Sequence, residues 1–208
     1  MRNFDVGMQF AIDECYLPAT VTAAPMTDEE FTAFCSGYPD YFIEMTAEGE
    51  IEIMPSNFSL TGSRHAEINW QLKQWARLHR EGLVTDAAAG FRLPNGARRS
   101  PDVAWTSKQR VRSQQGAGER GYWHLAPDFV IELRSQTDRL PKLRAKMREW
   151  IENGCHMAWL IDPERRAVEV YRPGHEAKIL TDPVSVTGEG PVGGFLLELR
   201  LVWNPLSE

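Results

Sequence analysis

A carboxylate stands inside an apolar run, where an ionisable side chain is unexpected. Glu132 lies within the stretch "PDFVIELRS", which begins at residue 127. The run around it is short, rich in β-branched and aromatic residues, and bounded by turn signals, so it predicts a buried strand. An unpaired carboxylate in such a strand costs roughly several kcal/mol, so it must take up a proton or find a cation. The sequence therefore predicts a cation close to Glu132.

Two further residues can act together with Glu132. Asp102 follows Ser-Pro at the start of another predicted strand, where the proline fixes how the chain enters. Lys146 lies on the next predicted helix, roughly 60° from Leu143 on a helical wheel, so its amino group can reach past the edge of the sheet. Two carboxylates can hold Mg²⁺, which prefers oxygen ligands and retains several waters, and we expect Mn²⁺ to substitute for it. A metal-bound water beside a lysine is suited to the hydrolysis of phosphodiester bonds.

Each of these residues also has a purely structural interpretation. An Asp after Ser-Pro is often a turn former. Glu132 can be a buried acid that pairs with Arg134 or Arg144. Lys146 taken alone can be an ordinary solvated helix residue. The catalytic interpretation therefore requires that the three side chains meet in space.

Periodicity and turn signals predict the elements that would position these residues. We expect helices that begin near residues 27, 61 and 138, the last of which ends near 153. Two hairpins are expected, one in "YFIEMTAEGEIEIMP" and one in "GFRLPNGARRSPDVAW", where Asn95-Gly96 is the strongest turn signal. A loop is expected from about 106 to 126, and "HMAWLID" and "RAVEVYRP" are expected to be strands. This order predicts an α/β (α+β) fold with a mixed β-sheet, flanking helices and extra β-hairpins.

Length and composition limit the classes of protein to consider. The 208 residues suit one domain, which we place at residues 26–208, after a loosely structured leader at residues 1–25. No apolar run approaches the roughly 20 residues of a membrane helix, and the acidic N-terminal stretch lacks the apolar core of a signal peptide. Cys15, Cys35 and Cys155 show no metal-ligand spacing, which favours reduced thiols. We therefore expect a cytoplasmic protein that does not span a membrane.

The charge is unevenly distributed along the chain. The net charge is −6, yet residues 98–148 hold twelve basic and five acidic side chains. Such a segment can form a local face that attracts anions. Arg110 and Arg112 lie in the predicted exposed loop of this segment and are candidate contacts for a phosphate backbone. The alternative is that these charges are solvated and that folding separates them.

Several stretches together resemble the restriction-endonuclease-like superfamily with the PD-(D/E)XK signature. The stretches that carry the resemblance are "GSRHAEINWQL", "LPNGARRSPDVAW", "PDFVIELRS", "LRAKMREWIENG" and "AWLIDPERRAVEVYRPG". The sequence is most similar to a bacterial branch of small single-domain endonucleases that was long known only as a domain of unknown function. The resemblance implies a restriction-endonuclease-like core over most of the chain, a DNA substrate, a Mg²⁺ cofactor and a homodimer.

The resemblance also implies roles for individual residues. Asp102 takes the first acidic position of the signature and Glu132 the second. The usual lysine would lie two residues after Glu132, where this chain has Arg134. In the branch that the sequence resembles, the lysine comes from the following helix, which points to Lys146. Many members also place a glutamate of the first core helix near the metal, and Glu67 fits that position.

The remaining candidates concern substrate binding and the rival functions. Arg134 and Ser135 are candidate phosphate contacts, although Ser135 also suits a cap for the turn into the next helix. His65 is the weakest candidate on the first core helix. We expect a metal-dependent endonuclease, and Arg134 in the lysine position keeps open a nuclease-fold module that binds nucleic acid or a protein without cleavage. A structural or regulatory dimer that uses tryptophan-rich surfaces is a third interpretation.

Overall fold

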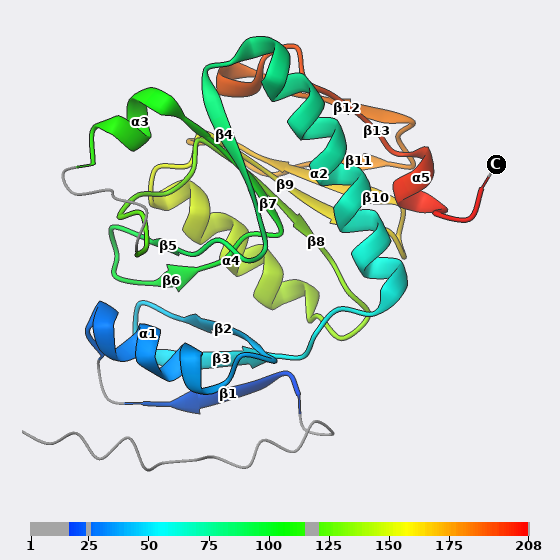
Figure 1. The fold of residues 1–208 in the computed structure, drawn as a ribbon. Helices are drawn as coiled ribbons and strands as arrows, with labels where there is room; N and C mark the ends of the chain where they lie inside the picture. The colour runs from blue at the N-terminus through cyan, green and yellow to red at the C-terminus, as the bar shows by residue number, and fades with distance from the viewer. Residues whose placement is uncertain (1–16, 24–25, 115–120, 208) are drawn as a thin grey trace, which may run out of the picture.

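The core of the molecule is a six-stranded mixed sheet, as the sequence predicts (Figure 1). The computed structural model describes residues 17–23, 26–114 and 121–207. The strands of the core sheet, in their spatial order, are β11 (Lys178–Thr181), β10 (Ala167–Tyr171), β9 (Met157–Asp162), β8 (Phe129–Leu133), β7 (Val103–Ser107) and β4 (Gly82–Asp86). The central strands β8 and β9 run parallel, and the other neighbouring pairs of this sheet are antiparallel.

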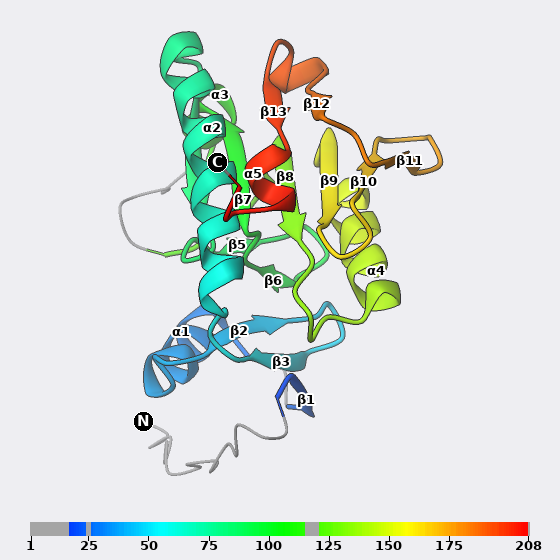
Figure 2. The same cartoon turned by 90° about the vertical axis from the view of Figure 1, so that its right-hand side faces the viewer.

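Helices cover both faces of the core sheet (Figure 2). α2 (Ser59–His79) packs on one face, where it meets Ile131 of β8. α4 (Leu140–Glu152) packs on the other face, where it meets Val130. Successive side chains of a strand point to opposite faces, so Glu132 shares the α4 face with Val130. Glu132 is therefore directed at the helix that carries the predicted lysine.

A second sheet lies beside the core, next to α4 (Figures 1 and 2). Its strands, in spatial order, are β1 (Ala19–Thr22), β3 (Glu50–Met54), β2 (Phe42–Met45), β6 (Arg98–Arg99) and β5 (Phe91–Arg92), and all its pairs are antiparallel. α1 (Asp28–Gly37) packs on this sheet through the buried ring of Phe31. Thr27 caps α1 in a capping box with Glu30, as its position before an acidic first turn predicts.

The chain passes from the second sheet to the core sheet at Ser100-Pro101-Asp102. The Asn95-Gly96 turn is present, and Gly96 has a φ of 93°, which glycine adopts without strain. The turn joins β5 to β6, while the last residues of the predicted hairpin continue into the core as β7. Asp102 thus stands between two sheets, immediately before β7.

Several predicted boundaries differ from the observed ones. The leader prediction is wrong at residues 19–22, whose β-branched residues form β1 and pair with β3; residues 1–16 and 24–25 lie outside the described part. The division into residues 1–25 and one domain at 26–208 otherwise stays a prediction. The expected loop from 106 to 126 contains a short helix, α3 (Lys108–Arg112), because Ser107 accepts a hydrogen bond from the Arg110 N–H. The remaining elements are β12 (Ser185–Thr187), the 3-10 turn η2 (Gly190–Val192), β13 (Leu196–Glu198) and α5 (Arg200–Trp203).

Among the described residues, no helix combines the length and the apolar character that crossing a membrane requires.

Candidate active site

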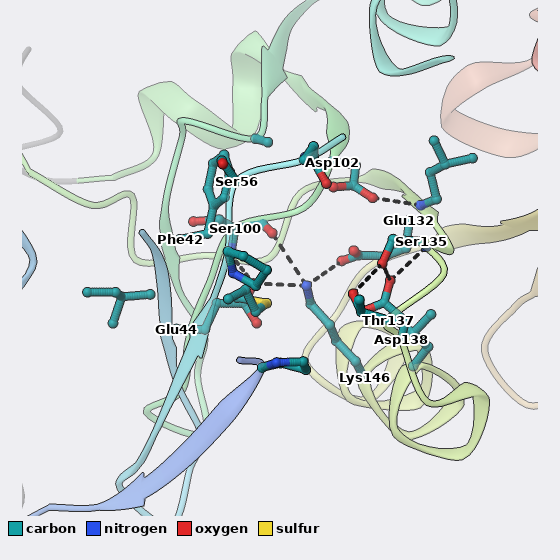
Figure 3. Close-up of a pocket in the computed structure, with 18 of the residues that line it drawn as sticks. Phe42, Glu44, Ser56, Ser100, Asp102, Glu132, Ser135, Thr137, Asp138 and Lys146 are labelled. Carbon is teal, nitrogen blue, oxygen red and sulfur yellow. Dashed lines mark hydrogen bonds and ion pairs between the residues drawn. The ribbon is translucent and has the colours of Figure 1, made fainter. Parts of the chain in front are cut away.

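A pocket lies where the core sheet, the second sheet and α4 meet (Figure 3). Asp102 and Glu132, which are far apart in the sequence, both line it, and so does Lys146. The other lining residues with polar side chains include Glu44, Ser56, Asn57, Ser100, Ser135, Thr137 and Asp138. The fold therefore brings together the two carboxylates and the lysine that the sequence singles out.

Asp102 enters the pocket from the crossing between the two sheets. Its Oδ2 accepts a hydrogen bond of 2.7 Å from the Leu133 N–H of the neighbouring strand, and His65 Nε2 lies 3.5 Å from the same oxygen. Burial would raise the pKa of Asp102, but the contacts with His65 and the Leu133 N–H outweigh burial and hold the pKa below its usual range. Asp102 is thus kept as a carboxylate, the form in which it can bind a cation.

Glu132 has the cation that its place in the strand requires. Its side chain is only 4% exposed, and its Oε1 lies 2.9 Å from Lys146 Nζ and accepts a 2.9 Å hydrogen bond from Trp150 Nε1. Burial, reinforced by the carboxylates of Asp102 and Glu44, raises the pKa of Glu132 to about 8, although Lys146 opposes the rise. Both contacts come from α4, so the helix that packs on this face also supplies the partners of Glu132.

Lys146 stands at the centre of the pocket's polar contacts (Figure 3). Its Nζ donates to Glu44 Oε1 at 2.8 Å and to the Ser100 carbonyl at 3.4 Å, in addition to its contact with Glu132. Burial would lower the pKa of Lys146, but the carboxylates of Glu132 and Glu44 outweigh burial and raise it. The ammonium group has three N–H donors, and three acceptors surround it here.

Glu44 is a residue of this site that the sequence interpretation missed. It lies on β2, its side chain is 3% exposed, and Lys146, the Ser100 N–H (2.8 Å) and Arg99 Nη1 (3.1 Å) contact its two oxygens. The signal was the one that marked Glu132, because "YFIEM" also places an acid inside an apolar strand. The predicted hairpin accounts for the strand of that stretch but gives its acid no partner.

Arg99 extends these contacts into a buried ionic network. Besides Glu44, it contacts Glu52 of β3, and its Nε donates to Glu149 Oε2 of α4 at 2.6 Å. Lys142 of α4 lies 3.0 Å from the other oxygen of Glu52. The second sheet is therefore fastened to α4 by ion pairs on either side of Lys146 along the helix.

The donors in the pocket fit a hard divalent cation. Two carboxylates with oxygen donors line one cleft, and Mg²⁺ is commonly held by one or two carboxylates while it retains waters. Among the described residues, no group of three or more His, Cys, Asp and Glu side chains is placed to hold a metal ion, so any further ligands would be water, backbone or substrate oxygens.

Comparison with known proteins identifies the family and the fold. The model of the family described as "Uma2: Putative restriction endonuclease" matches residues 28–200. The chain belongs to the Uma2 family. The fold is that of the restriction-endonuclease-like superfamily, as predicted. A crystal structure titled as a "putative nuclease belonging to DUF820" from Anabaena variabilis is similar to this Uma2 protein, with a TM-score of 0.68 and 21% identity over 86% of this chain and 98% of the other. None of the curated proteins compared with the chain matches it.

In this Uma2 protein, Arg134 points away from the pocket that holds Glu132. Its Nη1 donates to Asp162 Oδ2 at 2.9 Å and lies 3.4 Å from Glu164 Oε2. Arg134 instead lines an adjoining pocket with Asp162 and Arg64. In a continuous strand, residues 132 and 134 would point to the same face of the sheet. Residue 134 lies after the end of β8, however, so its side chain follows the turn toward the end of β9. Lys146, rather than Arg134, is the cation beside Glu132.

Two other candidates on neighbouring elements have different positions. Ser135 lines the pocket, but its N–H and its hydroxyl both donate to Asp138 Oδ2 at 2.7 Å, so it stabilises the turn before α4. Glu67 is not among the lining residues, and its Oε1 accepts a hydrogen bond from Gln71 Nε2 at 2.8 Å. On α2 it is His65, the weaker candidate by sequence, that lies beside Asp102. Burial would lower the pKa of His65, but Asp102 outweighs burial and raises it.

Arg110 and Arg112 lie at the other end of β7 from Asp102. Both belong to α3, so the prediction of a loop is wrong for both of them, and the prediction of exposure holds for Arg112 alone. Arg110 is half-buried, and its guanidinium donates to Asp128 Oδ1 at 3.1 Å and to the Gly154 carbonyl at 2.8 Å, while Arg112 is exposed. Arg110 therefore fastens α3 to the core.

The basic segment does not survive folding as one free cationic face. At least seven of its twelve basic side chains pair with acidic residues. These are Arg98, Arg99, Arg110, Arg134, Lys142, Arg144 and Lys146. These seven side chains are paired with acids rather than solvated, so neither a free anion-attracting face nor the alternative of solvated charges describes them.

Proposed function

We propose that this protein is a metal-dependent endonuclease that hydrolyses DNA phosphodiester bonds. The observation that carries the proposal is that Asp102, Glu132 and Lys146 line one pocket, with Lys146 Nζ 2.9 Å from Glu132. Membership of the Uma2 family supports a nuclease-like function, and the choice of DNA as the substrate rests on the family's description. The similar crystal structure supports the fold.

Asp102 and Glu132 are the residues that would hold the ion, Mg²⁺ or, in its place, Mn²⁺. When bound, such an ion would lower the pKa of a water ligand and offset negative charge on the phosphate. Asp102 contributes a carboxylate that is held ionised and is oriented by the Leu133 N–H. Trp150 Nε1 fixes Oε1 of Glu132. Lys146 places a positive charge beside Glu132, where it would stabilise negative charge that develops on the phosphate.

Cellular context and assembly are further parts of the proposal. We place the protein in the cytoplasm, supported by Cys35 and Cys155, which are free thiols among the described residues.

We propose a homodimer, as the family resemblance implies. Trp70 and Leu78 of α2 are 58% and 83% exposed, which supports a surface that a second copy would cover. Sedimentation of the purified protein tests the dimer.

The rival function is a nuclease-fold module that binds nucleic acid or a protein and does not cut. A specific observation favours it. Three acceptors already surround Lys146 Nζ, so the lysine must release one of them before it can contact a phosphate or a water. Arg134, which occupies the usual lysine position, is turned toward Asp162 and does not offer a substitute.

Plasmid cleavage distinguishes the two functions. The protein is incubated with supercoiled DNA in chelator, in Mg²⁺ and in Mn²⁺, and the nicked and linear products are measured. The proposal expects products only with metal, and it expects Asp102→Asn and Glu132→Gln to lower the rate by about 100-fold or more, the scale for loss of one preorganised electrostatic group. Binding of DNA by the wild type without cleavage under either metal supports the rival.

A further inference from the structure

The contacts of Lys146 are divided between two sheets. Glu132 belongs to the core sheet and is a proposed ligand of the metal. Glu44 belongs to the second sheet, and its Oε1 receives both Lys146 Nζ and the Ser100 N–H at 2.8 Å. One acid that contacts the lysine would thus bind the metal, while the other is held by protein groups alone.

This division matters because a cation and an ammonium group repel each other. A divalent ion on Glu132 would place two positive charges close to Lys146 Nζ, which now lies 2.9 Å from a Glu132 oxygen. The attraction between Lys146 and Glu132 would then weaken. The contact with Glu44 does not depend on the ion in this way.

The position of Glu44 is itself fixed by its surroundings. Its second oxygen accepts a hydrogen bond from Arg99 Nη1 at 3.1 Å, and the side chain is 3% exposed. Arg99 in turn reaches Glu149 on α4, less than one helical turn beyond Lys146. Glu44 therefore stands in a rigid frame that includes the helix carrying the lysine.

We propose that Glu44 is a positioning residue that holds Lys146 at the pocket while Glu132 binds the metal. The role rests on the proposed function, because Lys146 needs to be placed only if a phosphate is attacked beside it. Glu44 acts through Lys146 and contacts neither the proposed metal nor the substrate.

The chain supplies a matched control in Glu52. Glu52 lies on the neighbouring strand β3 opposite Glu44, is also buried, and shares Arg99 as a partner. Its other cation is Lys142, at 3.0 Å, rather than Lys146. A loss that follows from disturbing the ionic network would appear in Glu52→Gln as well as in Glu44→Gln, while a loss that follows from misplacing Lys146 would appear in Glu44→Gln alone.

A double-mutant cycle measures whether Glu44 acts through the lysine. Single-turnover cleavage with saturating enzyme and Mn²⁺ is compared for wild type, Glu44→Gln, Lys146→Ala, the double variant and Glu52→Gln. We expect Glu44→Gln to slow cleavage about tenfold or more in the wild-type background and less than about twofold in the Lys146→Ala background, because residues that act as a unit are not additive. Glu52→Gln should stay within about threefold of wild type. Equal losses from Glu44→Gln in both backgrounds, or an equal loss in Glu52→Gln, would overturn the proposal.

A second measurement does not depend on cleavage. Nitrogen-15 spectra that detect lysine ammonium groups should show a protected Lys146 signal, assigned by its absence in Lys146→Ala. When Mg²⁺ is added, the signal should persist in wild type and in Glu52→Gln. In Glu44→Gln, the signal should be lost on addition of Mg²⁺. An unchanged signal in Glu44→Gln would overturn the positioning role. A wild type that never cuts would overturn the proposed function, and this spectrum would still decide the contact.

Folding of the variants is checked by thermal unfolding. If Glu44→Gln does not fold, Glu44→Asp keeps the charge and shortens the side chain by one methylene. Its Lys146 signal should then be shifted or weakened and its cleavage rate should be intermediate. A wild-type rate and a wild-type signal in Glu44→Asp would contradict a role that depends on the exact reach of Glu44.

Discussion

Two buried acids stand near opposite ends of β8, and each lies beside a cation. Asp128 precedes the strand and contacts Arg110, while Glu132 lies within the strand and contacts Lys146. Both residues are 5% exposed or less. Judged by burial and charge alone, the two ends are alike.

The two ends differ in what else surrounds the acid. Both oxygens of Asp128 are used, since Oδ2 accepts from the Ser107 N–H at 2.7 Å and Oδ1 from Arg110. Both contacts of Glu132 fall on Oε1, and a second acid, Asp102, lines the same pocket. A buried acid with a cation is therefore an ordinary structural device, and a pair of acids that share a pocket is the stronger sign of chemistry.

The largest effect on cleavage is expected from Lys146, and it distinguishes Lys146 from Arg134. Lys146→Ala should lower single-turnover cleavage by about 100-fold or more, the scale for losing a preorganised charge. Arg134→Ala should lower cleavage far less, because Arg134 is paired with Asp162 outside the pocket. Arg134→Lys should retain cleavage. Rapid quench with saturating enzyme and Mn²⁺ measures all three variants.

The assignment of Lys146 is wrong if the result is reversed. Cleavage at the wild-type rate by Lys146→Ala together with an inactive Arg134→Ala would move the catalytic role to Arg134. Binding of DNA by Lys146→Ala, measured without metal, should remain within about twofold of wild type, since the lysine is buried and paired with two acids.

The other end of β8 should respond in stability. Asp128→Asn removes the charge that Arg110 and the Ser107 N–H share, and it should lower the free energy of unfolding by about 2 kcal/mol, as the loss of a charged partner in a largely buried pair does. Urea denaturation measures the change. Cleavage by the folded variant should stay near the wild-type rate. A loss of cleavage as large as that of Lys146→Ala would remove the distinction between the two ends.

The sequence predicts the elements that carry the site well, because those elements are defined locally. The apolar run around Glu132 and the apolar stripe beside Lys146 are visible in short windows, and the observed β8 and α4 agree with them. The charge contrast is equally local: an acid in an apolar strand requires a cation, and that cation is present.

The partners that the sequence did not reveal come from packing between distant segments. Glu44 reaches Lys146 only because the second sheet packs against α4, 102 positions further along the chain. Arg134 pairs with Asp162 because β9 lies parallel beside β8, a register that no short pattern encodes. Arg110 is half-buried because it pairs with Asp128, which packing brings beside α3. The sequence therefore predicts the candidate residues of the site well, but it predicts poorly which side chains are exposed on the surface.

A smaller effect is expected from metal binding to the unreacted protein. Mn²⁺ at ten times its dissociation constant should stabilise the wild type by about 1.4 kcal/mol through mass action. The double variant Asp102→Asn/Glu132→Gln should show no such shift, while Asp128→Asn should show the full shift from its lower starting point. Thermal unfolding with and without Mn²⁺ measures it. Equal shifts in the wild type and in Asp102→Asn/Glu132→Gln would remove the proposed metal site.

The smallest effect on DNA binding is expected from the two arginines of α3, for which the sequence predicts the same role. Arg112 is exposed, so Arg112→Glu should leave stability unchanged and, if α3 contacts DNA, weaken binding a few-fold at low salt. The dependence of log K on log salt should then flatten by about one phosphate contact, a slope change near 0.9. Arg110→Glu would place a second acid against Asp128, so it should destabilise the fold before it reports on binding. Fluorescence anisotropy of a labelled duplex over a salt series, performed without metal, measures both variants. An unchanged slope in Arg112→Glu would exclude Arg112 from the DNA-binding surface.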